Sequence, residues 1–233
     1  MKLEEFKLKT LGIDKKKFKR IYTFVDFGNV NYWFEKDRKN FDGALLPQNK
    51  KLIIGIEKLA SFINSFSEKK RFYYGLNTRD KSTWHITNLA DKYNFKVNKK
   101  PIQWVKHYLD IRKDKNIKLN HRIKKDGGGI FIEIPKCNFD VEITIDAIRL
   151  IDHYDTFALF SGDSDFSMLL RFLGGKTRKI ILFYAGRISH TLKDHADLLI
   201  NAQQVKNSVC ILKEIKRTPY KGVRKSDPHP RAG

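Results

Sequence analysis

The sequence predicts an α/β fold with a mainly parallel central sheet. Short apolar runs typical of buried strands alternate with longer segments whose apolar residues recur at helical spacing. Two of the runs, residues 21–25 and 156–160, end in a small acidic turn that leads into a helical pattern. Such alternation is typical of parallel strands joined by right-handed crossovers. One α/β domain therefore accounts for most of the 233 residues.

The N-terminal half begins with residues 1–20, which predict a basic arm or helix because weakly amphipathic residues precede a run of Lys and Arg. Strands are predicted at residues 21–25, 71–76 and 95–98. A short helix follows the first strand, and apolar spacing predicts a longer helix over residues 51–66. Residues 77–80 are expected to cap a third helix, which runs to about residue 93.

Residues 99–135 interrupt this alternation. The segment is rich in Lys and Arg, carries three glycines at 127–129 and ends in the strand-like run 130–134. Because the glycines precede a strand and open no helix, they predict a turn rather than a dinucleotide-binding loop. We interpret the segment as a basic loop or hairpin inserted beside the acidic turns.

The C-terminal half holds the remaining elements. The helix after residue 138 is amphipathic, with Val141, Ile145 and Ile148 on one face and a polar stripe on another. Strands are predicted at residues 156–160, 179–185 and 197–200, and a helix at residues 208–215. Residues 206–233 are thus expected to form a C-terminal helix and a basic tail, whose charge, Pro and Gly content predicts disorder when the tail is free.

The net charge of +21 and the pI near 9.9 predict a polyanionic partner, with nucleic acid as the leading candidate. A genome that favours lysine codons would raise the charge in the same way. The distribution favours nucleic acid, because acidic residues gather at predicted strand ends whereas basic residues fill the insertion and both ends of the chain.

The sequence argues against a membrane or secreted protein. No apolar run is long enough to span a bilayer, and the N-terminus lacks a signal-peptide core. Cys137 and Cys210 have neither metal-ligand spacing nor the pattern of a disulfide framework. We therefore expect a cytoplasmic protein in which both cysteines are small buried side chains.

Acidic residues follow the predicted strands. Asp26 ends the first strand, Asp163 and Asp165 follow the strand at residues 156–160, and Asp140 begins a helix between them in sequence. Parallel strands end at one edge of a sheet, where open α/β sheets bind ligands. Carboxylates brought together there repel one another unless a cation lies among them, and oxygen-only ligands select hard cations such as Mg²⁺ or Mn²⁺.

Each acid also has a structural interpretation. Asp163 or Asp165 could cap the following helix, and Asp26 could hold its turn. Asp146 is a weaker candidate, since six helical positions separate it from Asp140 and turn the two side chains about 120° apart. They would share one metal ion only if Asp140 precedes the helix, and an exposed Asp146–Arg149 ion pair is the alternative. The joint occurrence of acids at successive strand ends favours a site.

Four motifs occur in the order found in a known family. They are V-D-F-G-N-V-N at 25–31, K-x-x-x-D-x-x-x-x-x-D-A at 136–147, L-F-S-G-D-S-D-F at 159–166 and S-H-T-L-K-D-H-A-D at 189–197. With these motifs the chain resembles the NYN domains of the PIN-like nuclease superfamily, in particular the LabA-like group. The resemblance implies a Rossmann-like three-layer α/β/α sandwich at residues 21–205. It also implies a ribonuclease that depends on Mg²⁺ or Mn²⁺ and leaves 5′-phosphate and 3′-hydroxyl ends.

The resemblance further implies roles for single residues. Asp26, Asp140 and Asp163 are expected to bind the metal, with Asp146 as a further candidate ligand. Asp165 is expected to be a supporting catalytic acid, and Asn29 to position the attacking water or the scissile phosphate. The expected substrate is single-stranded RNA or loops of folded RNA, and self-association into a homo-oligomer stays open.

The residues expected to hold RNA lie in the insertion and the tail. They are Arg112, Lys113, Arg122, Lys124, Lys125, Lys216, Arg217, Lys221 and Arg224. Two other functions compete with the ribonuclease. A haloacid-dehalogenase-like phosphatase needs an Asp two residues after its nucleophile, where this chain has Gly28. An RNA-binding or scaffold module of the same fold would differ by the absence of metal-dependent turnover.

Overall fold

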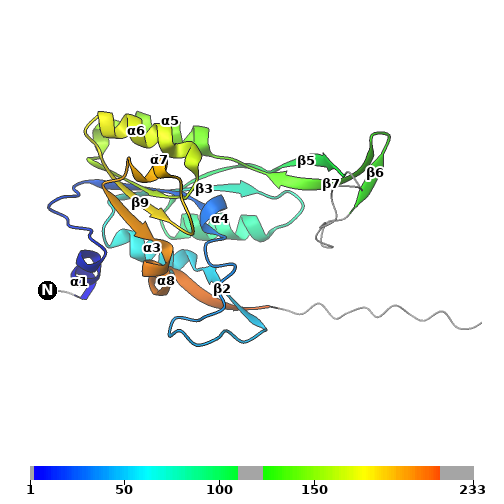
Figure 1. Cartoon of the computed structure of the whole chain (residues 1–233), viewed down its shortest axis with the longest axis horizontal. Helices are drawn as coiled ribbons and strands as arrows, with labels where there is room; N and C mark the ends of the chain where they lie inside the picture. The colour runs from blue at the N-terminus through cyan, green and yellow to red at the C-terminus, as the bar shows by residue number, and fades with distance from the viewer. Residues whose placement is uncertain (1–2, 110–122, 216–233) are drawn as a thin grey trace, which may run out of the picture.

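A six-stranded parallel sheet forms the centre of the molecule in the computed structural model, which describes residues 3–109 and 123–215 (Figure 1). Its strands are β1 (Ile21–Asp26), β3 (Lys69–Leu76), β4 (Lys96–Pro101), β8 (Thr156–Phe160), β9 (Lys179–Tyr184) and β10 (Leu198–Asn201). Their order is β10-β9-β8-β1-β3-β4, and every neighbouring pair is parallel. The predicted α/β class is confirmed.

Helices cover both faces of this sheet. One face packs against α1 (Leu3–Thr10), α3 (Ile56–Asn64), α4 (Ser82–Lys92) and α8 (Ala202–Val209), and the other against α5 (Asp140–Arg149), α6 (Ser167–Gly175) and α7 (His190–Lys193). Successive strand residues alternate between two buried clusters, so Phe24 packs on the α5 side and Val25 on the α3 side. This arrangement is the predicted three-layer sandwich.

The sheet reverses its direction of growth beside β1. From β1 the chain moves outward to β3 and β4, and it later returns to place β8, β9 and β10 on the other side of β1. Ligands of open α/β sheets bind at such a switch point, outside the carboxyl ends of the strands. The turns after β1 and β8 therefore lie where a site is expected.

Two predicted helical segments are wrong in part. Residues 50–54, most of which were assigned to a helix, form β2 (Lys50–Ile54), and α3 begins only after Gly55. The predicted helix at residues 208–215 is instead the end of α8 followed by β11 (Cys210–Glu214). β2 and β11 pair as an antiparallel ribbon with Ile54 opposite Cys210. A Cβ added at Gly55 would lie 2.8 Å from Cγ2 of Ile211, so the Ile211 side chain packs directly over Gly55 and would have to shift for a larger residue.

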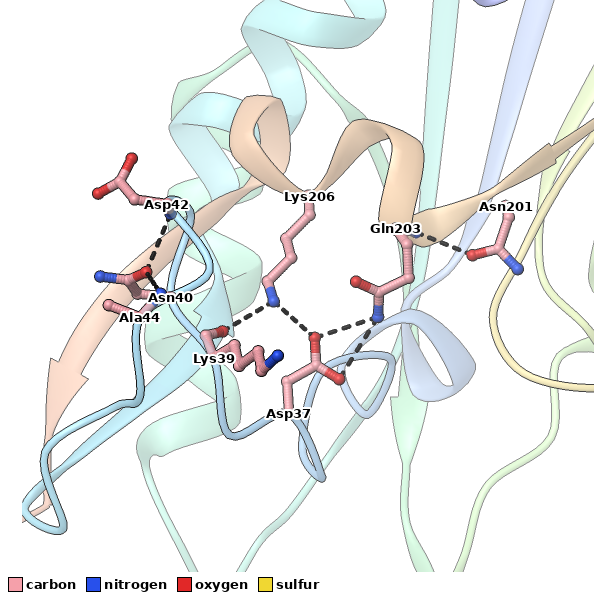
Figure 2. Close-up of polar contacts among 8 residues, drawn as sticks. All are labelled: Asp37, Lys39, Asn40, Asp42, Ala44, Asn201, Gln203 and Lys206. Carbon is pink, nitrogen blue, oxygen red and sulfur yellow. Dashed lines mark hydrogen bonds and ion pairs between the residues drawn. The ribbon is translucent and has the colours of Figure 1, made fainter.

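The loop between β1 and β2 is fastened to α8 by polar contacts (Figure 2). Asp37 accepts hydrogen bonds from Nε2 of Gln203 and forms a 2.8 Å ion pair with Lys206. Nζ of Lys206 also donates to the carbonyl oxygen of Lys39, and Oδ1 of Asn40 accepts from two backbone amides of the same loop. Helix α8 is thus attached to the loop that precedes β2.

The basic insertion forms a three-stranded antiparallel sheet that projects from the body (Figure 1). It consists of β5 (Gln103–Tyr108), β6 (Lys124–Asp126) and β7 (Gly129–Lys136), in the order β5-β7-β6. We call these three strands the arm. Gly127 and Gly128 form the tight turn between β6 and β7 that the glycine triplet predicted, and Gly129, with φ of +123°, begins β7 directly after it.

Helix α5 is oriented differently from its apolar pattern. Val141 is 67% exposed and Ile145 is 49% exposed, whereas Ile143 and Ala147 are fully buried. The polar stripe faces β3, because Asp146 pairs with Arg71 of that strand.

Within the described residues, no helix is long and apolar enough to cross a membrane.

Candidate metal centre

Asp140, Asp163 and Asp165 form a group of acids at the carboxyl edge of the sheet. One carboxylate oxygen from each lies within 4.8 Å of the others. Asp140 is the first residue of α5, and Asp163 and Asp165 belong to the turn after β8 that continues into η2 (Ser164–Phe166). The predicted convergence of these strand-end acids is therefore present in the fold.

Asp163 has a local structural role as well. Its Oδ1 accepts a hydrogen bond from the backbone N–H of Asp165, which makes Asp163 the N-cap of η2. Its own backbone N–H donates to Oγ of Ser161. The two interpretations of Asp163 are thus compatible, because the same carboxylate caps η2 and belongs to the acidic group.

Asp26 lies beside this group, at the end of β1. Burial raises the pKa of Asp26 to about 6, and the charges of Asp140 and Asp163 add to the increase. Hydrogen bonds from Oγ of Ser161 and the backbone N–H of Asn29 oppose it. Of the three predicted metal ligands, Asp140 and Asp163 are in the compact group, where Asp165 takes the third place and Asp26 is a close neighbour.

Asn29 joins the turns that follow β1 and β8. It lies in α2 (Phe27–Val30), and its Oδ1 accepts hydrogen bonds from the backbone N–H of Gly162 and from Nε1 of Trp33. The Trp33 ring in turn stacks on Phe160 at a centroid distance of 5.9 Å. The side chain thereby connects α2 to the turn after β8, and its Nδ2 makes no hydrogen bond within the described residues.

Ser161 is a residue of the candidate site to which the sequence patterns assigned no role. It is fully buried, donates to Oδ2 of Asp26 at 3.0 Å and accepts from the Asp163 backbone N–H at 3.2 Å. Its hydroxyl therefore links two of the predicted metal ligands. The available signal was its place in the S-G-D-S-D motif, directly at the end of a buried strand.

Asp140 is held in place by Asn138. Nδ2 of Asn138 donates to the carboxylate at 2.5 Å, and Oδ1 of Asn138 accepts from the Asp140 backbone N–H. Burial raises the pKa of Asp140, and the charges of Asp163 and Asp165 raise it further. Burial and neighbouring negative charges both disfavour the ionised form of this carboxyl group, so a cation bound here would be stabilised by it.

An ion pair between Lys100 and Glu142 lies beside the acidic group. Glu142, two residues after Asp140, forms a 2.5 Å ion pair with Lys100 at the end of β4. The Lys100 ammonium also lies 4.7 Å from the ring centre of Phe139. The other oxygen of Glu142 is buried and has no hydrogen-bond partner among the described residues. No sequence signal pointed to this pair, because it joins residues of β4 and α5 that only the fold brings together.

Asp146 does not join the acidic group. Its Oδ2 accepts hydrogen bonds from Arg71 at 2.7 Å and from the hydroxyl of Tyr73 at 2.8 Å. Arg71 therefore takes the place of Arg149, the partner considered in the sequence. Asp197 likewise has structural partners, since it accepts from the backbone N–H of Ile180 and from Lys179 at the start of β9.

The structure places two of the predicted RNA-binding residues. Both are exposed; Lys124 forms a 2.7 Å ion pair with Glu133 on the neighbouring strand, whereas Lys125 forms no ion pair within the described residues. The others lie outside the described residues: Arg112, Lys113, Arg122, Lys216, Arg217, Lys221 and Arg224.

The motifs, the sheet order and the acidic edge agree with one family. A family model described as the NYN domain matches residues 20–203. The chain belongs to the NYN domain family. This match confirms the resemblance that the four motifs indicate. Similarity to the protein LabA supports the LabA-like assignment. The matched residues include all strands of the central sheet of this NYN protein.

Two relatives illustrate the likeness. The low amplitude and bright protein LabA of Synechococcus elongatus is 31% identical over 75 residues, which are 32% of this chain and 40% of that protein. The crystal structure of a protein of unknown function from Vibrio parahaemolyticus has a TM-score of 0.55 and 22% identity, over 83% of this chain and 97% of that chain. The second likeness shows that the NYN protein shares that fold.

Proposed function

We propose that this NYN protein is a metal-dependent ribonuclease that hydrolyses phosphodiester bonds of RNA. The observation that carries the proposal is the convergence of Asp140, Asp163 and Asp165 within 4.8 Å at the switch point of the sheet. The net charge of +21 supports a polyanionic substrate, because an acidic centre in a basic protein matches a phosphate chain bound through cations.

The donor set fits Mg²⁺ or Mn²⁺. It consists of carboxylates alone, and hard divalent cations prefer oxygen ligands. Asp140, Asp163 and Asp165 would hold the ion, and Asp26 would join them through bound water or directly. When bound, such an ion lowers the pKa of a water molecule and neutralises charge on the phosphate.

The residues around the acids keep the site in shape. Ser161 orients Asp26, Asn138 orients Asp140, and the turn of η2 orients Asp163. Asn29 uses its amide oxygen to join the two turns, so its nitrogen is the atom left to donate to a phosphate oxygen. Preorganised donors of this kind stabilise developing charge without further rearrangement.

The test is cleavage of labelled single-stranded and structured RNA with Mg²⁺, with Mn²⁺ and with EDTA. We expect cleavage by the wild type with either ion, and none by Asp163→Asn. Asp42→Asn removes the same charge from an exposed loop and should cut normally. If the wild type binds RNA but leaves every substrate intact with both ions, the NYN protein is a binding module and the ribonuclease proposal is wrong.

A further inference from the structure

The arm has two faces that differ in charge. Paired residues of an antiparallel sheet share a face, and successive residues alternate. The register places one set of side chains on what we call the closed face: Trp104, Lys106, Tyr108, Lys124, Phe131 and Glu133. It places a second set on what we call the open face: Gln103, Val105, His107, Lys125, Ile130, Ile132, Ile134 and Lys136. Of these, Ile132 is buried, at 8% exposed.

The cations of the closed face have partners within the protein. Lys106 pairs with Asp126 at 2.5 Å, and Lys124 pairs with Glu133. Arg79, from the loop after β3, reaches the same face, where it pairs with Glu133 and stacks 4.2 Å from the ring centre of Trp104. The cations of the closed face are therefore all paired, and the face is attached to the body of the protein.

The open face has cations without such partners. Lys125 and Lys136 are exposed, and neither takes part in an ion pair within the described residues. Between them in the register, Val105 is 47% exposed and lies opposite Ile134, which is 40% exposed. Apolar side chains thus lie between two free lysines on one face of the sheet.

The open face leads to the acidic group. Within β7, Ile130 is the partner of Lys125. The stretch from Ile130 to Lys136 is about 20 Å long, because extended chain rises about 3.3 Å per residue. Cys137 follows and packs at the base of the arm, where a Cβ on Gly75 would lie 2.8 Å from its sulfur. Asp140 begins α5 three residues later. A strand of nucleic acid on this face would therefore reach the acids at its Lys136 end.

We propose that the open face of the arm binds single-stranded RNA and guides it to the acidic group, an inference that rests on the proposed ribonuclease. Lys125 and Lys136 contact phosphates, and Val105 with Ile134 contacts unpaired bases or riboses between them. The apolar pair selects single strands, because a duplex keeps its bases stacked inside and presents phosphates and hydroxyls to a protein surface.

The experiment compares two double variants that remove the same charge from opposite faces. Lys125→Gln/Lys136→Gln changes the open face, and Arg79→Gln/Lys106→Gln changes two cations of the closed face. Binding of a fluorescent single-stranded RNA is measured in EDTA over a range of salt concentrations. Melting temperature is recorded for both variants, and cleavage with Mn²⁺ is measured separately.

The open-face variant should bind RNA at least tenfold more weakly, with a salt slope reduced by about 1.4 for the two lost contacts. The closed-face variant should melt at a lower temperature yet keep the wild-type slope. A blunt RNA duplex should compete at least tenfold less well than a single strand. Equal slopes for the two variants, or equal competition by duplex, would overturn the inference. RNA binding that depends on the open face without any cleavage would uphold it and refute the ribonuclease.

Discussion

Asp26 is a carboxyl group whose environment favours the neutral form. Its pKa of about 6 lies above the ordinary value of 3.8, so the folded protein binds its proton more tightly than the unfolded chain does. The stabilisation is therefore fully present below pH 3.8 and is lost as the pH rises through 6. Two pKa units correspond to about 3 kcal/mol at most.

Asp26→Asn should raise the melting temperature of the metal-free protein at pH 8, because the ionised group no longer has to be held near Asp140 and Asp163. Near pH 4 the two proteins should melt alike. Thermal unfolding in EDTA at both pH values measures this. Asp155→Asn is the control with the opposite sign, since Arg20 holds the pKa of Asp155 below its ordinary value and the substitution removes their ion pair. A lower stability of Asp26→Asn at pH 8 would contradict the raised pKa.

Asp163 combines a cap and a charge, and two substitutions separate them. Asparagine caps helices as well as aspartate does, whereas alanine at an N-cap costs about 1 kcal/mol. Both Asp163→Asn and Asp163→Ala should abolish cleavage. Only Asp163→Ala should lose stability in EDTA, measured by chemical denaturation. Retained cleavage by either variant would remove Asp163 from the proposed site.

The acids of the site could be named from the sequence, but their supporting residues could not. Asp140, Asp163 and Asp165 lie at strand ends and in family motifs, which are local signals. Ser161 and Lys100 act through partners far away in the sequence, Asp26 and Glu142. No local pattern contains those contacts. The roles that the resemblance implies for single residues remain predictions.

At the scale of elements, two substitutions in α5 test which face of this helix packs into the core. Ile143→Ala should destabilise the protein by about 2–4 kcal/mol, because the side chain is fully buried between α5 and the sheet. Ile145→Ala, on the exposed face, should change stability by less than about 0.5 kcal/mol. Urea unfolding of both variants measures the difference. An equal loss of stability in both variants would mean that Ile145 is buried rather than exposed.

The strands of the central sheet were predicted well, whereas the ribbon of β2 and β11 was missed. Leu52 and Ile54 suit a half-buried strand, but with Ile56 and Leu59 they also suit a helix. Pairing with β11 decides between the two, and β11 lies at the far end of the described chain. For α5, the polar stripe turns inward because Arg71 and Tyr73 offer partners to Asp146, which helical periodicity does not reveal.

At the scale of the whole molecule, Arg79 connects the arm to the body. Hydrogen bonds from Arg79 and Lys124 hold the pKa of Glu133 at about 2, below its ordinary 4.5. The stabilisation by this carboxylate is therefore complete above pH 4.5 and is lost only as the pH falls through 2. The attachment of the arm should persist over the whole range in which proteins normally work.

Arg79→Ala should loosen the arm and leave the central sheet intact, because it removes both the Glu133 ion pair and the Trp104 stack. Amide hydrogen exchange should become faster in β5 and β7 and stay unchanged in β1 and β8. Arg79→Lys keeps the charge but loses the planar stack, so intermediate rates are expected. Unchanged exchange in the arm of Arg79→Ala would show that other contacts hold it.

The central position of β1 also bears on how the protein is made. β1 is translated well before Ser161, which donates a hydrogen bond to Asp26 at the end of β1 and follows 135 residues later. Contacts across such separations form late, because a long loop must close first. A nascent chain lacks the acidic edge until residues 156–166 have left the ribosome. An enzyme with the proposed activity would thus be unable to cut its own messenger RNA before that point of its synthesis.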